Sequence, residues 1–142
     1  MLFRSFTGIP NGVKRVTINF YNLTKSGTTY SFGARLGSGS LTTSGYFSIG
    51  TYAVNTVGNQ QGTDRFTTPF TGSNTIDSGS FVFCHMGSNL WIGNHTLAAH
   101  SGSTYYTGVG SGYVTLSGVL DRVALTYDSD TFTGGSVNCF YE

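Results

Sequence analysis

Histidine is the residue through which this chain would most readily bind a metal ion. The three histidines, His85, His95 and His100, are separated by ten and five residues. This spacing contains neither the HxH pair that faces the metal in cupin barrels nor the HExxH pattern of zinc hydrolases. We therefore predict histidines on the polar surface of strands or turns, and no metal site.

The carboxylates could serve as a catalytic pair. The six of them are Asp64, Asp77, Asp121, Asp128, Asp130 and Glu142. A glycosidase needs two, about 5–10 Å apart, with one held protonated in an apolar pocket, and no motif marks such a pair. Asp128-Ser129-Asp130 offers oxygen ligands for Ca²⁺, but the following TFTGG lacks the bidentate Glu of a calcium loop. A solvated turn is the preferred interpretation.

Motifs for nucleophilic attack or phosphate binding are also missing. The stretches Gly110-Ser111-Gly112 and Gly37-Ser38-Gly39 do not match the GxSxG nucleophile elbow and are interpreted as turns. No GxxxxGK[ST] loop occurs. We predict a protein that is not an enzyme and has no cofactor, with a small hydrolase as the least supported alternative.

Cys84 and Cys139 are the two cysteines. They form no CxxC motif, and two cysteines are too few for a disulfide-rich scaffold. A disulfide between them would close a long loop and stabilise the fold by roughly 4 kcal/mol, but a reducing cytoplasm argues against it. We predict free, buried thiols.

Aromatic side chains remain as candidates for binding. Trp91, Tyr105 and Tyr106 lie near turns, and Tyr52 lies in the glycine-rich middle of the chain. Exposed Tyr and Trp are rigid, amphipathic surfaces that stack on sugar rings or anchor protein interfaces. For Trp91, between Leu90 and Ile92, a core position is the preferred interpretation. Adjacent strand residues face opposite sides, so at most one of Tyr105 and Tyr106 is buried.

The composition narrows the possible partners. Only 9 % of residues are charged and the net charge is +1, whereas about 25 % of an average globular protein is charged. Binding to nucleic acid needs several cations on one face, and is not expected here. No apolar run is long enough to span a membrane, and the opening MLFRSFTGIPNG lacks the apolar core of a signal peptide. Few charges and many hydroxyls favour assembly with other proteins.

Apolar and polar residues alternate along most of the chain, which is typical of half-buried strands. Residues 30–36 alternate clearly, and Lys25-Ser26-Gly27 before them predicts a hairpin turn. A second hairpin is predicted around Gly87-Ser88-Asn89. Residues 37–79, richer in Gly, Asn and Pro, predict shorter strands with exposed connections.

We predict an all-β, antiparallel β-sandwich, jelly-roll-like and formed as a single domain over residues 1–142, with seven to nine strands. Less than about a tenth of the chain should be helical, because no segment has an apolar face with a period of 3.6 residues. The predicted core residues are Phe20, Phe32, Leu36, Phe83, Leu116, Val123 and Leu125.

Two stretches at opposite ends of the chain carry a resemblance. The opening is FTGIPNGVKRVTINFYNL and the close is SGVLDRVALTYDSDTFTGGSVNCFYE. In order and spacing they resemble the first segment and the final hairpin of a β-rich module of bacteriophage tail-fibre and other virion surface proteins. TTSGYFS matches the module's TTGY stretch more loosely, so the resemblance brackets residues 3–142. The chain departs from it at Thr133, usually Asp, and at Cys139 and Phe140, usually aliphatic.

The resemblance implies a non-enzymatic structural protein of the virion, of tail-fibre or head-decoration type, assembled in the host bacterial cytoplasm. It implies a homotrimer that meets other virion proteins and contacts the host, for example a surface glycan. We expect the terminal strand, residues 137–142, and the strand at residues 123–127 to meet other copies, because a bare sheet edge invites pairing. The alternative is a monomeric carbohydrate-binding module, which a solution mass would distinguish.

Overall fold

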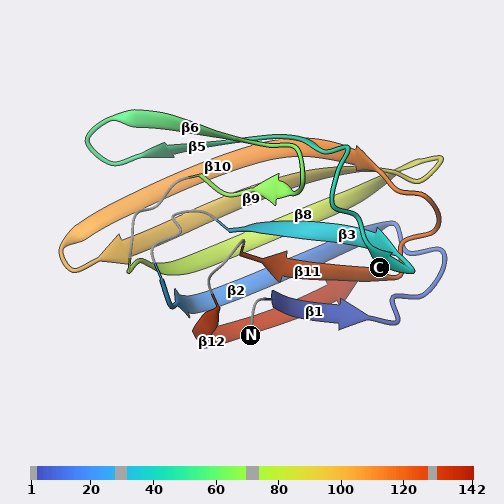
Figure 1. The fold of residues 1–142 in the computed structure, drawn as a ribbon, viewed down its shortest axis with the longest axis horizontal. Coiled ribbons are helices and arrows are strands. Elements are labelled where there is room, and N and C mark those ends of the chain that lie inside the picture. Colours follow the sequence, from blue (N-terminus) through green and yellow to red (C-terminus); the bar gives the residue numbers. More distant parts are fainter. Residues whose placement is uncertain (1–2, 28–31, 70–73, 128–130) are drawn as a thin grey trace.

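The protein folds as an antiparallel β-sandwich (Figure 1). The computed structural model describes residues 3–27, 32–69, 74–127 and 131–142. Within these residues the chain forms twelve strands and no helix. The all-β prediction is confirmed, and the strands are more numerous than the seven to nine expected.

Seven strands form the larger sheet. Neighbouring strands in it are antiparallel throughout. In spatial order they are β12 (Phe132–Tyr141), β2 (Arg15–Lys25), β8 (Ile76–Gly87), β9 (Leu90–Ser101), β10 (Thr104–Thr115), β5 (Phe47–Ala53) and β6 (Val57–Gly62).

Five shorter strands form the second sheet, which covers one side of the first. In order they are β1 (Phe3–Thr7), β11 (Arg122–Thr126), β3 (Gly33–Ser38) and β4 (Ser40–Leu41), with β7 (Phe66–Thr67) also paired to β3. In Figure 1, β5 and β6 lie at the far edge of the larger sheet from β1.

Successive strands often belong to different sheets, and two predicted hairpins are wrong for this reason. Lys25-Ser26-Gly27 follows β2 of the larger sheet, whereas β3 belongs to the smaller one. Gly27 has φ 95°, as a turn glycine does. The close of the chain likewise places β11 and β12 in different sheets. Each of these strands has one apolar face. When the chain crosses from one sheet to the other, the next strand buries its apolar face in the same core, from the opposite side.

The expected contact surface is also corrected. β11 pairs with β1 on one side and β3 on the other, and residues 123–127 are buried. This strand therefore cannot meet another copy. β12 does form an edge of the larger sheet, because among the described residues it pairs with β2 alone.

The hairpin predicted at Gly87-Ser88-Asn89 is confirmed. Gly87 pairs with Leu90, and Ser88 and Asn89 have φ values of 49° and 62°. Positive φ at both residues of a two-residue loop matches the right-handed twist of the strands that it joins.

One apolar core fills the space between the sheets. All seven predicted core residues are buried in it. The Phe32 ring packs edge-on against Phe20, with centroids 5.3 Å apart, and lies 5.4 Å from Tyr127. Edge-to-face contact aligns the positive ring edge with a negative ring face. Tyr30, which the predicted alternation groups with Phe32, lies outside the described residues.

Candidate functional site

The four predicted aromatic candidates do not form one site. Trp91 is only 2 % exposed and belongs to the core. Tyr106 and Tyr52 are half-buried, on positions of β10 and β5 that face the second sheet. Tyr105 points away from it and is 72 % exposed. Its ring lies 6.2 Å from that of His100 on β9.

The histidines are also separated. His85 lies at the end of β8 against the Trp91 ring, 5.0 Å away. His95 is buried, so the prediction of a surface position is wrong for it. Burial lowers the pKa of His95 to about 4, and within the described chain its Nε2 has no hydrogen-bond partner. The described residues contain no group of three or more His, Cys, Asp or Glu that could hold a metal ion.

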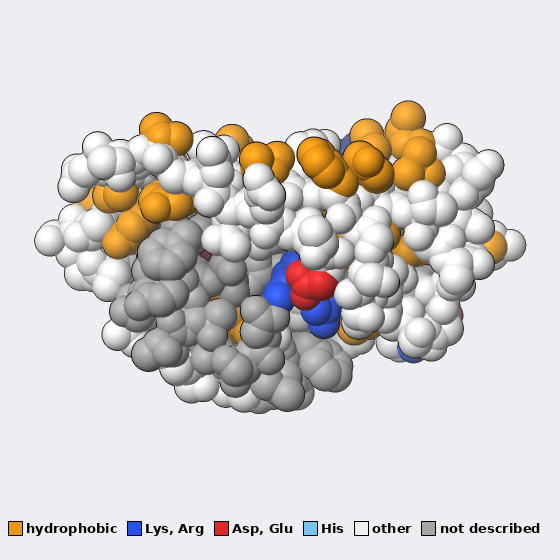
Figure 2. All heavy atoms as spheres, turned by 45° about the horizontal axis from the view of Figure 1, so that its top comes forward, with side chains coloured by type: hydrophobic (Ala, Val, Ile, Leu, Met, Phe, Trp, Pro, Cys, Tyr) orange, Lys and Arg blue, Asp and Glu red, His pale blue; other side chains and the backbone are white. Residues whose placement is uncertain are grey.

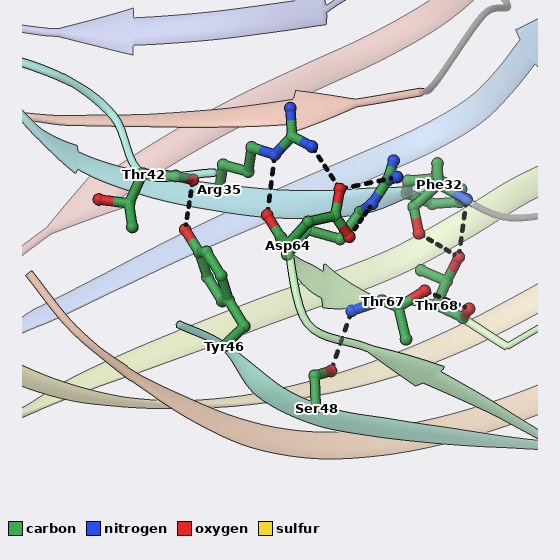
Figure 3. Close-up of polar contacts among 9 residues, drawn as sticks. Phe32, Arg35, Thr42, Tyr46, Ser48, Asp64, Thr67 and Thr68 are labelled. Atoms are coloured by element: carbon green, nitrogen blue, oxygen red, sulfur yellow. Dashed lines mark hydrogen bonds and ion pairs between the residues drawn. The ribbon is translucent and has the colours of Figure 1, made fainter. Parts of the chain in front are cut away.

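Three of the predicted carboxylates are held by arginines. Asp64 contacts Arg35 and Arg65, its Oδ2 lying 3.0 Å from Arg65 Nη2 (Figure 3). Burial opposes ionisation of Asp64, but the two guanidinium groups outweigh it and lower the pKa of the carboxyl. Asp121 pairs with Arg122 at 2.7 Å and Glu142 pairs with Arg15 at 3.3 Å. Asp128 and Asp130 lie outside the described residues.

The contacts of Asp64 are structural, because together with the hydrogen bonds of Thr67 and Thr68 they fix the segment from Thr63 to Pro69 against both sheets. Thr67 N donates to Ser48 Oγ of β5 at 3.0 Å (Figure 3). Thr68 Oγ1 donates to Phe32 O at 2.7 Å. Phe66 packs into the core, with its ring 5.1 Å from that of Phe83.

Glycines on the larger sheet leave room for the segment from Thr63 to Pro69. A Cβ on Gly50 of β5 would lie 2.9 Å from Pro69 N, and one on Gly62 of β6 would lie 2.9 Å from Thr67 Cβ. A Cβ on Gly108 of β10 would overlap the Pro69 ring. Only glycine permits this close approach of the segment to the sheet.

The approach determines the orientation of β5 and β10. The inward positions of β10 carry Gly108, Gly110 and Gly112, while Val109 and Tyr113 face outward. The Gly-Ser-Gly stretch 110–112 is therefore strand interior rather than the predicted turn. β5 likewise turns Phe47 and Ile49 away from the core, while its Tyr52 faces the second sheet.

We name the side of β8, β9, β10, β5 and β6 that faces away from the second sheet the outer face. Register places its residues in five transverse rows. Across the strands the rows are Cys84, Ile92, Tyr113 and Phe47; Val82, Asn94, Ser111, Ile49 and Gln61; Ser80, Thr96, Val109, Thr51 and Asn59; Ser78, Ala98, Thr107, Ala53 and Val57; and Ile76, His100 and Tyr105.

The outer face is apolar and hydroxyl-rich, and none of these positions is Asp, Glu, Lys or Arg. Its large exposed apolar side chains are Phe47, Ile49, Val57, Ile92, Tyr105, Val109 and Tyr113. Figure 2 shows hydrophobic side chains gathered along the margin formed by β5 and β6, whereas the largest group of charged side chains in that view lies below this margin. Sequence reasoning missed most of this surface because it interpreted Gly110-Ser111-Gly112 as a turn and residues 37–79 as short strands with exposed connections.

The relief of the outer face is shallow. The rings of Phe47 and Tyr113 stack across neighbouring strands, with centroids 5.4 Å apart. One hollow of about 120 Å³ lies beside Phe47 and Ile49, and another of about 140 Å³ lies between Val57 and Val109. Such a surface can bury apolar area against a flat partner, and it presents no acid, base or nucleophile arranged for chemistry.

Both cysteines are free, as predicted, but they are half-buried rather than buried. Cys84 lies on the outer face and Cys139 on the core side of β12. Burial raises the pKa of the Cys139 thiol, which makes its reactive thiolate scarcer.

Comparison of the chain with protein-family models, with curated proteins and with solved structures finds no match. None of the structure's described residues forms a helix long and apolar enough to cross a membrane.

Proposed function

We propose that this protein is a non-enzymatic structural module of a bacteriophage virion, of tail-fibre type. In this proposal it lies on the particle surface, assembles with copies of itself, and meets the host there. The observation that carries the proposal is the pairing, in both sheets, of the two stretches that resemble the virion module.

The opening stretch contains β1 and β2, and the closing stretch contains β11 and β12. β1 pairs with β11 in the smaller sheet, and β2 pairs with β12 in the larger one. Two segments from opposite ends of the chain thus pair with each other at one edge of the sandwich, in both layers. A shared framework of this kind is what a common module requires.

Loop contacts inside these stretches support the same interpretation. Asp121 O accepts from Ile9 N at 3.1 Å, and the Asp121 carboxylate accepts from Arg122 Nε at 2.7 Å and from Gly39 N at 3.1 Å. Ile9-Pro10 of the opening stretch and Leu120-Asp121-Arg122 of the closing stretch are therefore held together by the hydrogen bond between Ile9 and Asp121. Their role is to build the framework, not to bind a ligand.

In this proposal the rest of the chain supplies the surface through which the module contacts its partners. Residues 47–62 and 76–115 build the outer face, which lies outside both resembling stretches. A module used in many particles would keep its framework and vary the surface with which it makes contacts. The trimer that the resemblance implies belongs to this proposal.

The test is to locate the protein on purified particles from a bacterial culture that expresses the gene. Gold-labelled antibody should mark one fixed position on each particle, and mass spectrometry should find the protein at stoichiometric amounts. Labelling should disappear when recombinant protein competes for the antibody. Particles that lack the protein would contradict the proposal.

The second candidate is a monomeric carbohydrate-binding module, and the exposure of Tyr105 beside His100 favours it. A sugar ring stacked on Tyr105 would change its fluorescence and shift its ring resonances in an NMR titration. Tyr105→Ala should then abolish binding, while Tyr21→Ala, an exposed tyrosine on β2, should not. A monomeric mass together with saturable sugar binding would favour this candidate over the virion module.

A further inference from the structure

The outer face leaves large apolar side chains exposed to water. On β10, Val109 is 58 % exposed while the inward neighbours Gly108 and Gly110 have no side chain to bury. Burying a valine side chain stabilises a fold, so the fold of one chain forgoes that contribution here. A second layer over this face would recover it.

The distribution of charge indicates which kind of partner can cover the outer face. Every row of the outer face lacks Asp, Glu, Lys and Arg, so a charged partner would find no counter-ion and would lose its hydration. Another copy of the same face has no charge to desolvate. The net charge of the chain is only +1, so two copies repel each other weakly.

The size of the face is sufficient for a stable contact. Its five strands, about 4.8 Å apart, span roughly 20–24 Å, and positions 92 to 100 along β9 span about 27 Å. The plan area is therefore roughly 600 Å², and side-chain relief raises the contact area toward the about 800 Å² per partner of a standard interface.

We propose that the outer face binds the outer face of a second copy of this chain, sheet against sheet. Rows such as Cys84, Ile92, Tyr113 and Phe47 then interdigitate with their counterparts, as the inner faces of a sandwich do at a spacing of about 10 Å. This proposal rests on the proposed function as an assembling module, but not on its trimer, because a face that binds its own counterpart closes as a two-fold dimer.

Val109 provides the sharpest test, because it lies in the middle row between Thr96 and Thr51. In a single copy, Val109→Lys projects its ammonium group into water. In the complex, the ammonium group enters an interface whose facing copy offers no carboxylate. Self-association should weaken by roughly 100-fold or more, since an unpaired charge is buried. Thr96→Lys should act in the same way.

The matched control is Val119→Lys, which adds the same charge at an exposed valine outside the outer face. Sedimentation velocity from about 1 to 200 µM should show self-association of the wild type and of Val119→Lys, and monomer for the two outer-face variants. Far-ultraviolet circular dichroism and thermal melting should show that all four proteins are folded.

Two results would overturn the inference. One is a wild type that stays monomeric up to 200 µM. The other is an oligomer that both outer-face variants leave intact, in which case another surface assembles and the virion proposal stands. If the outer-face variants dissociate the oligomer but the protein is missing from purified particles, the proposed function fails while this interface remains.

Discussion

Tyr46 ties the two sheets together through one hydroxyl group. Leu36 N of β3 donates to Tyr46 Oη at 3.0 Å, and the hydroxyl donates to Thr42 O at 3.1 Å (Figure 3). Its ring meets Phe66 edge-on, with centroids 5.3 Å apart. Burial raises the pKa of Tyr46 to about 12, so the hydroxyl stays protonated and able to donate.

Tyr46→Phe keeps the ring and removes both hydrogen bonds. The buried Leu36 N–H then loses its partner, and the free energy of unfolding should fall by about 1–3 kcal/mol. Urea unfolding measures this loss. Tyr21→Phe is the control, because Tyr21 is exposed and its hydroxyl has no partner among the described residues. Equal stability of the two variants would mean that the Tyr46 hydroxyl contributes nothing.

His95 has a buried imidazole that cannot readily accept a proton. It packs on Phe81, with ring centroids 5.1 Å apart, and a Cβ on Gly110 would lie 2.7 Å from its Nε2. Burial lowers its pKa to about 4 from an ordinary value of 6.5. The unfolded chain therefore binds a proton that the folded chain refuses between these two pH values.

This difference makes stability depend on pH in a defined direction. The contribution of neutral His95 is complete above pH 6.5 and is lost as the pH falls through about 4. The free energy of unfolding should drop by about 3 kcal/mol over that interval. In His95→Leu most of this dependence should disappear, whereas Thr96→Val, on the opposite face of β9, should keep it. Urea titrations at several pH values compare the slopes, and an unchanged slope in His95→Leu would count against this assignment.

At the scale of elements, β10 shows how glycine decides the orientation of a strand. Its inward glycines let the segment from Thr63 to Pro69 and the His95 ring approach the backbone. A Cβ on Gly110 would lie 2.7 Å from Ile49 O as well as close to His95. Because the Ile49 carbonyl belongs to the backbone of the neighbouring strand, it has little freedom to move away from an added Cβ.

Gly110→Ala should therefore destabilise the fold by about 1–3 kcal/mol through overpacking. The sign is informative, because alanine in place of glycine in an unobstructed strand stabilises by about 0.5 kcal/mol. Ser111→Ala, the next residue on the outer face, should change stability by less than about 0.5 kcal/mol. Differential scanning calorimetry of the two variants tests the prediction, and a stabilised Gly110→Ala would show that the inward side is not tightly packed.

At the scale of the whole molecule, charge lies outside the outer face but reaches its border, where Arg15 of β2 pairs in register with Cys84. The Arg35, Asp64 and Arg65 group and the Asp121–Arg122 pair serve the loops between strands. The Arg15–Glu142 pair lies at the β2 and β12 end of the larger sheet. Contact through the outer face should consequently involve apolar burial and hydroxyl contacts rather than ion pairs.

Self-association should therefore be nearly independent of ionic strength. Between 50 and 500 mM sodium chloride the dissociation constant should change by less than about threefold, because salt screens charges and this interface has none. Sedimentation equilibrium at the two salt concentrations measures it. Dissociation at high salt would point to charged groups elsewhere as the contact.

Local signals in the sequence determined the fold class, the core and one hairpin. Alternation with a period of two identified strands and the buried Phe20 and Phe32. Where large apolar residues lie on one face of a strand and small polar residues on the other, the apolar face is the one that is buried. The hairpin at Ser88 and Asn89 followed from turn chemistry alone. The opposite orientation of Tyr105 and Tyr106 followed from strand geometry.

Only the tertiary structure decided which sheet each strand joins and which side of β5 and β10 is covered. Alternation defines two faces of a strand without saying what lies on either, so Gly27 marked a turn but not a crossing between sheets. Val109 and Phe47 face outward because Thr67 and Pro69, far away in sequence from β10, occupy the glycine side. The outer face exists for that reason: a long-range contact over glycines turned the apolar residues toward water.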